Sequence, residues 1–135
     1  VVDELDATRV SATLWEYSQS AELWNDEDLS IVDADGTPRP ILDVYVRPWL
    51  RAVAGTDPSF HWDAAARTAT AAWTGDGGVS ELVLPAGLFA DGPQDMSLKT
   101  VSGPDGACLT HDPERGELRV RVPAGARVEL EFSGP

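Results

Sequence analysis

The side chains best suited to contact a ligand lie early in the chain, where an expected strand ends and a polar loop begins. Trp15, Tyr17 and Ser18 close the run VSATLWEYS, and Trp24 follows in the loop. An indole ring can stack on the apolar face of a sugar ring, and the hydroxyl groups of Tyr17 and Ser18 can hydrogen-bond a ligand hydroxyl. The alternative is that Trp15 closes a hydrophobic core and that the other three side chains pack within the loop.

Other residue types that can do chemistry give weaker patterns. Strand alternation is expected to place Glu16 on the face opposite the preceding indole. Asn25–Asp28 has only part of the spacing of a calcium loop and lacks its Gly and its final Glu, which favours a solvated loop. His61 and His111 have no Cys or acidic ligand pattern around them, and Cys108 is expected to be a small buried hydrophobic residue within a strand. We therefore predict no metal site and no cofactor.

Composition limits the kind of protein. The chain has 135 residues, of which 42% are hydrophobic, and this is enough for one domain with a buried core. It has 23 acidic and 10 basic residues, a formal charge of -13, which argues against binding to nucleic acid. No run reaches the roughly 18–20 apolar residues of a membrane-spanning helix. The single cysteine excludes an internal disulfide and a Cys-based zinc cluster. The sequence begins at Val1 without Met or a signal peptide, which we interpret as a product cut from a longer protein.

From residue 55 onward, short apolar runs alternate with turn residues, as in an antiparallel β-sheet protein. In the last two runs apolar residues alternate with charged ones, which predicts one buried face and one solvated face. The residues expected to be buried there are Leu118, Val120, Val122, Val128, Leu130 and Phe132. Seven or eight short strands fit a small β-sandwich, with Trp62 and Trp73 in its core. The expected strands are Phe60–Trp62, Thr68–Thr74, Val79–Leu84, Met96–Val101, Cys108–Thr110, Glu117–Val122 and Arg127–Phe132.

Residues 1–54 have a different pattern. Val2–Arg9 is expected to form a short helix or turn. Val10–Tyr17 is rich in β-branched and aromatic residues without clean alternation, which is typical of a strand covered on both faces. A single such strand leaves both edges unpaired, so it needs partners outside this sequence. We therefore expect residues 1–54 to be the last βα unit of a larger domain and residues 55–135 to be a separate sandwich domain.

The helix of that βα unit is expected over residues 41–50, where apolar residues recur at three- and four-residue spacing. Pro48 would break or kink this helix. Arg47, Trp49 and Arg51 lie at the junction of the two parts. We expect them to hold the parts together through contacts of Arg with carboxylates or aromatic rings.

Three segments together resemble a known family: SATLWEYS (11–18), WNDEDLS (24–30) and RPWLRAVAG (47–55). Their succession resembles the end of glycoside hydrolase family 5 enzymes of the endoglycoceramidase type. In that family a (β/α)8 barrel ends with a strand that carries a Trp, followed by a last helix and an RPY-x-RA-x-AG-like entry into a C-terminal β-sandwich. Trp49 stands where the family has Tyr. The fold class that this implies is mainly β, an antiparallel β-sandwich preceded by the last βα unit of a barrel whose remainder is absent from this chain.

The resemblance also implies a reaction. Retaining glycosidases use a nucleophile and an acid/base carboxylate about 5–5.5 Å apart. In the family these two Glu residues follow the fourth and seventh barrel strands, which would both precede Val1, and no Glu-Phe-Gly nucleophile motif occurs here. The chain is thus expected to hold no catalytic residue and to be inactive alone, while Trp15 would form a floor under the sugar.

The function implied is therefore that of part of a secreted or extracellular enzyme that hydrolyses the bond between oligosaccharide and ceramide in glycosphingolipids. Its partners would be the glycosphingolipid substrate and the missing barrel portion, with Trp15, Tyr17, Ser18 and Trp24 as substrate-binding residues. Transient contact with a membrane or micelle would need an apolar loop tip. Leu88-Phe89 is the only short apolar loop tip in the sandwich. The alternative is that these two residues anchor the loop in the core. A carbohydrate- or lipid-binding sandwich without catalysis is a second reading, favoured if Trp62 and Trp73 are exposed. A purely structural sandwich is a third.

Overall fold

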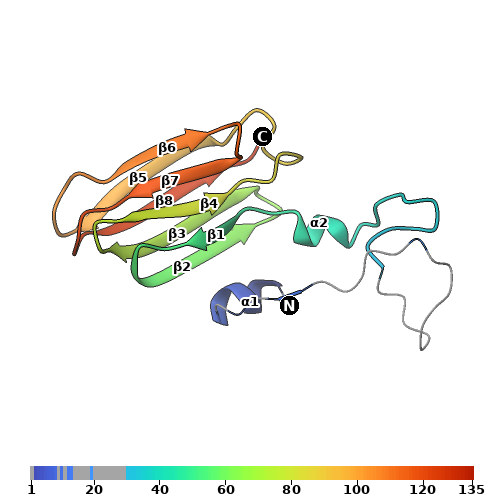
Figure 1. The fold of residues 1–135 in the computed structure, drawn as a ribbon, viewed down its shortest axis with the longest axis horizontal. Coiled ribbons are helices and arrows are strands. Elements are labelled where there is room, and N and C mark those ends of the chain that lie inside the picture. The colour runs from blue at the N-terminus through green and yellow to red at the C-terminus, as the bar shows by residue number, and fades with distance from the viewer. Residues whose placement is uncertain (1, 9, 11, 14–18, 20–29) are drawn as a thin grey trace. The chain divides into compact units, whose positions relative to one another are not determined.

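The computed structural model describes residues 2–8, 10, 12–13, 19 and 30–135 (Figure 1). The chain forms two compact units, Val1–Val46 and Arg47–Pro135. This division lies upstream of the expected boundary after residue 54, because residues 49–52 form a strand that pairs within the sandwich. In the described part of the chain, no helix has the length and apolar character needed to cross a membrane.

In the residues that the structure describes, the first unit contains two short helices, α1 (Val2–Thr8) and α2 (Leu42–Tyr45). The short segment expected over Val2–Arg9 is therefore a helix in its described part. The helix expected over residues 41–50 ends at Tyr45, close to the break expected from Pro48, and residues 49–52 form a strand instead of continuing it. Pro48 lacks a backbone N–H and disfavours helical backbone in the residue before it, so the chain leaves α2 and enters a strand. The strand expected over Val10–Tyr17 lies mostly outside the described residues.

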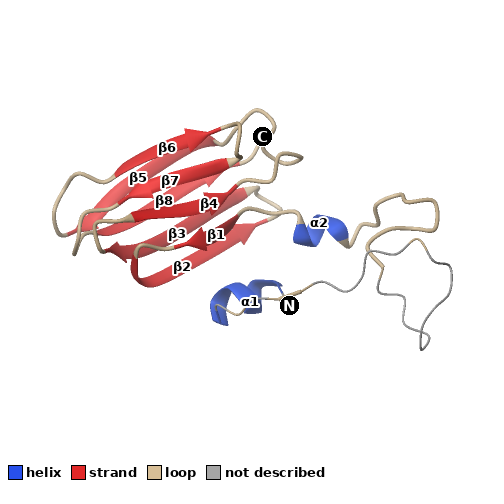
Figure 2. Ribbon diagram, in the orientation of Figure 1, coloured by secondary structure: helices blue, strands red, loops and turns tan. Residues whose placement is uncertain are grey.

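The second unit is a sandwich of two four-stranded antiparallel sheets (Figure 2). The first sheet has the order β1-β4-β7-β6 and the second has the order β2-β3-β8-β5. The strands of the first sheet are β1 (Trp49–Ala52), β4 (Val79–Val83), β7 (Glu117–Arg121) and β6 (Cys108–Asp112). Those of the second are β2 (Gly55–Asp63), β3 (Thr68–Gly75), β8 (Arg127–Ser133) and β5 (Gln94–Ser102). The predicted mainly β fold is thus confirmed, and its eight strands agree with the seven or eight that the sequence pattern indicated.

The core lies between the two sheets and is formed by alternate residues of their strands. All six apolar residues predicted to be buried in the last two runs are at most 1% exposed, so this prediction is confirmed. Trp62 and Trp73 also belong to the core, with exposed fractions of 7% and 0%. Burying such large apolar side chains is the main favourable contribution to folding, and it fixes which face of each strand remains outside.

A loop after β4 adds a third aromatic ring to this core. Phe89 is buried, and its ring centroid lies 6.0 Å from that of Trp62 and 5.9 Å from that of Phe132, both in tilted arrangements. The backbone N–H groups of Leu88 and Phe89 both donate to the carbonyl oxygen of Pro85, so the loop tip is a closed turn. Of the two expected roles for Leu88-Phe89, the structure supports the core anchor.

Candidate functional site

The side chains predicted to contact substrate, Trp15, Tyr17, Ser18 and Trp24, lie outside the described residues. The same holds for the acidic loop Asn25–Asp28. Their roles stay predictions. Candidate sites whose geometry is described therefore lie on the surface of the sandwich.

The aromatic residues of the sandwich do not form a binding platform. Trp62 and Trp73 are buried between the sheets, as expected for core residues, so neither ring can stack on a ligand without opening the core. This observation counts against a binding module that would hold glycans or lipids through these two side chains.

Cys108 is exposed, so the expectation that it would be buried is wrong. It pairs with Arg121 at the edge strand β6, and its neighbour Leu109 takes the inward position instead. A strand of this length carries too few alternating residues for its pattern to fix which face is inward. Within the described residues, no group of three or more His, Cys, Asp or Glu side chains is arranged to hold a metal ion.

The outer face of the first sheet carries a network of four charged side chains. Arg51 donates through Nη2 to Glu81 Oε2 at 2.9 Å, and the same nitrogen lies 2.7 Å from Glu117 Oε1. Arg119 Nη2 lies 3.1 Å from Glu81 Oε1. The pairing register shifts between Leu50 and Ala52, and this irregularity is where Arg51 reaches both carboxylates.

These contacts shift the pKa values of the participating groups. Hydrogen bonds from Arg51 and then from Arg119 lower the pKa of Glu81 below its ordinary value. Hydrogen bonds to Glu81 and then to Glu117 raise the pKa of Arg51. Both shifts favour the charged forms of Glu81 and Arg51, and each cation of the network is matched by a carboxylate of the same sheet. Arg51, expected to hold the two parts of the chain together, instead ties three strands of one sheet.

Trp49 begins β1 on this sheet and pairs with Val83. Its side chain is 42% exposed, which leaves an indole partly uncovered near the start of the second unit. For Arg47 and Trp49, the expectation that they hold the two parts of the chain together stays a prediction. The sequence did not show that residues 49–52 form a strand.

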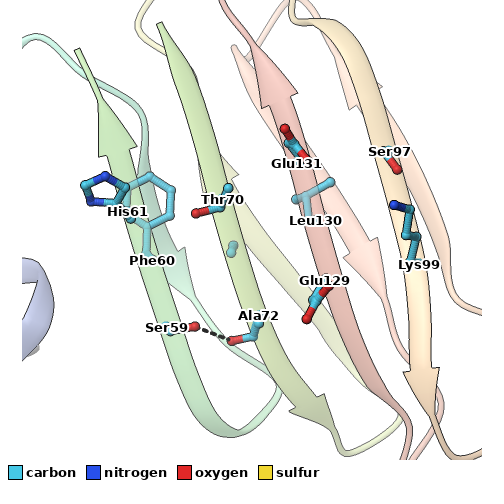
Figure 3. Close-up of a pocket in the computed structure, with 11 residues that line it drawn as sticks. Ser59, Phe60, His61, Thr70, Ala72, Ser97, Lys99, Glu129, Leu130 and Glu131 are labelled. Atoms are coloured by element: carbon cyan, nitrogen blue, oxygen red, sulfur yellow. Dashed lines mark hydrogen bonds between the residues drawn. The ribbon is translucent and has the colours of Figure 1, made fainter. Parts of the chain in front are cut away.

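The outer face of the second sheet carries a groove of about 290 Å³ (Figure 3). Its polar lining residues come from all four strands and include His61, Thr70, Ser97, Lys99, Glu129 and Glu131. Its lining on β3 includes the small side chains of Ala72 and Thr70. Ser59 Oγ donates to the carbonyl oxygen of Ala72 at 3.4 Å.

Sequence reasoning missed this groove as a candidate site. The alternation in β8 did predict that Glu129 and Glu131 face outward. However, the sequence does not show that Glu129 lies opposite Lys99 on one side and opposite Ala72 on the other, because that depends on the register of three strands. A groove assembled across strands leaves no local motif in the sequence.

No protein-family model matches this chain, and neither does any curated protein. Among solved structures, endo-glycoceramidase II from Rhodococcus sp. matches 79% of the chain at 25% sequence identity, with a TM-score of 0.56. Sterylglucosidase 1 from Cryptococcus neoformans matches 82% of the chain at 17% identity, with a TM-score of 0.59, which shows the fold alone. These matches cover 23% and 18% of the respective relatives, so the chain spans less than a quarter of their length. They confirm the predicted resemblance to part of an endoglycoceramidase.

Proposed function

We propose that this chain is the C-terminal part of a retaining endo-β-glycosidase of glycoside hydrolase family 5, which hydrolyses the bond between oligosaccharide and ceramide in glycosphingolipids. The observation that carries the proposal is the match to Rhodococcus endo-glycoceramidase II, at 25% identity over 79% of this chain. The sequence segments that suggested the same family lie before and at the start of the sandwich, so they support it separately from the strand pattern.

In this proposal the chemistry is divided between the chain and the rest of its parent. The two carboxylates of a retaining glycosidase would come from the barrel portion, and this chain alone is inactive. Trp15 would stack on the sugar next to the scissile bond. Tyr17, Ser18 and Trp24 would contact sugar hydroxyls or line the sugar groove. Such contacts hold the glycosidic bond in a reactive pose.

The sandwich would act as an accessory domain. Its core is complete, and the Arg51–Glu81–Arg119–Glu117 network ties together three strands of the first sheet without any outside partner. A binding module without catalysis is the alternative, and the burial of Trp62 and Trp73 removes its most direct form. We further propose that the parent is secreted, because glycosphingolipids are presented at membrane surfaces.

The test is a comparison of the full-length parent with the isolated chain on a defined glycosphingolipid such as lactosylceramide. The proposal predicts that the parent releases lactose first as the β-anomer, seen by proton NMR, and that the chain alone releases nothing. A steryl β-glucoside is the discriminating second substrate. Cleavage of the steryl glucoside without cleavage of lactosylceramide would contradict the proposed substrate class. First release of the α-anomer would contradict the retaining mechanism.

A further inference from the structure

The two outer faces of the sandwich differ in how their charged groups are satisfied. On the first sheet, the Arg51, Glu81, Glu117 and Arg119 side chains pair with one another. On the second sheet, Lys99, Glu129 and Glu131 form no ion pair and no side-chain hydrogen bond with any residue that the structure describes. The charged side chains of the first face therefore pair with one another, whereas these three groups of the second face have no charged partner within residues 30–135.

Strand register places these groups in two rows across the second sheet. One row runs from His61 through Thr70 and Glu131 to Ser97. The next row runs from Ser59 through Ala72 and Glu129 to Lys99. Figure 3 shows these side chains spread over β2, β3, β8 and β5 around the groove. A ligand lying across the strands would therefore meet a hydrogen-bonding group on every strand.

The part of the groove over β3 is lined by small side chains. Ala72 is half-buried, and Thr70 on the same strand has only a methyl group and a hydroxyl group. These small side chains, next to the longer Glu129 and Glu131 of β8, let a flat ring approach β3 with its C–H face down. The volume of about 290 Å³ is near the lower end of the range for small-molecule sites, roughly 300–1,000 Å³.

The chemistry of the lining selects the type of ligand. The carboxylate groups of Glu129 and Glu131 can only accept hydrogen bonds, and the Lys99 ammonium can only donate them. A ligand that satisfies both kinds of group must itself donate and accept, as the hydroxyl groups of a sugar do. An anion would be repelled by the two carboxylates and by a chain whose formal charge is -13. A metal ion lacks a ligand set in this groove, because no group of three or more His, Cys, Asp or Glu side chains among the described residues is arranged to hold one.

We propose that this groove is an accessory subsite for an uncharged oligosaccharide, separate from the substrate-binding residues predicted in the N-terminal unit. The proposal rests on the proposed function, because a glycolipid hydrolase meets its substrate as clustered glycans on a surface. Glu129 and Glu131 accept hydrogen bonds from sugar hydroxyls, Lys99 and Ser97 donate, and the ring lies over Ala72 beside His61. Weak binding at such a subsite raises the local concentration of substrate without taking part in the reaction.

The test is a titration of the isotope-labelled 135-residue chain with lactose, followed by amide chemical shifts. The chain is expected to hold no catalytic carboxylates, so hydrolysis does not interfere. We expect shifts in β2, β3, β8 and β5 that saturate in the millimolar range. Glu131→Gln removes one charged acceptor with little change of shape and should weaken this binding about tenfold. Ala72→Leu should abolish it by filling the space over β3.

Glu114→Gln is the matched control, because it removes an exposed carboxylate in the turn between β6 and β7, outside the groove. It should leave the affinity unchanged, and amide spectra of all three variants should retain the dispersion of the folded chain. The proposal is overturned if lactose produces no shifts on the second sheet, or if Glu131→Gln and Ala72→Leu leave them unaltered. It is also overturned if calcium chloride or a basic peptide occupies the groove at lower concentration than lactose does.

The outcome is separable from that of the proposed function. If the parent hydrolyses lactosylceramide but lactose does not bind the groove, only the proposed subsite is contradicted. If lactose binds the groove but the parent cleaves no glycosphingolipid, the proposed enzyme activity is contradicted. The chain would then be a carbohydrate-binding sandwich. Shifts confined to the region of Trp15 and Trp24 would support the predicted substrate contacts and would overturn the accessory subsite.

Discussion

Replacing Phe89 by Ala tests whether the loop between β4 and β5 is held by the core. The Phe89 side chain is 5% exposed and contacts two other buried rings, those of Trp62 and Phe132. Truncating a buried Phe to Ala costs about 3–5 kcal/mol, the sum of the lost transfer free energy and the cavity that stays behind. The sandwich cannot fully close this cavity, because both neighbouring rings belong to residues of paired strands, whose backbone positions are fixed.

For a domain of about 60–100 residues, each kcal/mol shifts the melting temperature by roughly 4–8 °C, so Phe89→Ala should lower Tm by at least about 12 °C. Thermal unfolding followed by circular dichroism measures this directly, and urea unfolding gives the free energy. Phe89→Leu should retain most of the stability, since it keeps much of the buried volume. Met96→Ala is the exposed control, because Met96 is 43% exposed, and its effect should stay within about 0.5 kcal/mol.

A Tm for Phe89→Ala within about 2 °C of the unmodified chain would refute this reasoning, given the shift expected for a core residue of a small domain. The ring would then contribute little to the core. Loss of binding to phosphatidylcholine vesicles in the same variant, without loss of stability, would instead assign Leu88-Phe89 to a membrane contact.

Three further predictions concern other parts of the chain. Because Arg51 and Arg119 hold the pKa of Glu81 below its ordinary value of 4.5, the stability it contributes is complete above that pH and is lost as pH falls through the lowered pKa. The urea midpoint of Glu81→Gln should therefore decline less on acidification than that of the unmodified chain, and equal declines would contradict the role of the network. Gly103 has φ +87°, and an added Cβ would lie 2.5 Å from the carbonyl oxygen of Gly125. Gly103→Ala should therefore lower the free energy of unfolding, measured in urea, by about 1–3 kcal/mol. An unchanged free energy of unfolding would contradict this. In the full-length parent, Trp15→Ala should lower kcat/KM for a glycosphingolipid about ten- to a hundredfold with little change in Tm, whereas a large fall in Tm with little kinetic loss would show a core Trp.

Much of the sandwich could be predicted from the sequence, because apolar and polar residues alternate along a strand that has one buried face and one solvent-exposed face. Leu130 and Phe132 lie inward and Glu129 and Glu131 outward, as their alternation indicates. The pattern failed where it was short or ambiguous. The apolar residues of β1 fit a helix as well as a strand, and only pairing with β4 selects the strand.

The candidate sites were harder to predict, for a physical reason. The Arg51–Glu81–Glu117 contacts and the groove beside Glu131 both depend on strand register, which is set by long-range pairing. A local motif can mark a residue such as Trp15 through a family resemblance. It cannot show which side chains of different strands become neighbours on a sheet.

The central claim is that the parent of this chain cleaves between glycan and ceramide, and the most direct measurement is the mass of the lipid released from lactosylceramide by the full-length parent. The account predicts free ceramide together with intact lactose, formed in equal amounts from the first time point. Glucosylceramide and galactose as the first products would show removal of the terminal sugar instead. That result, or an unchanged substrate under conditions where the folded parent is verified, would contradict the account.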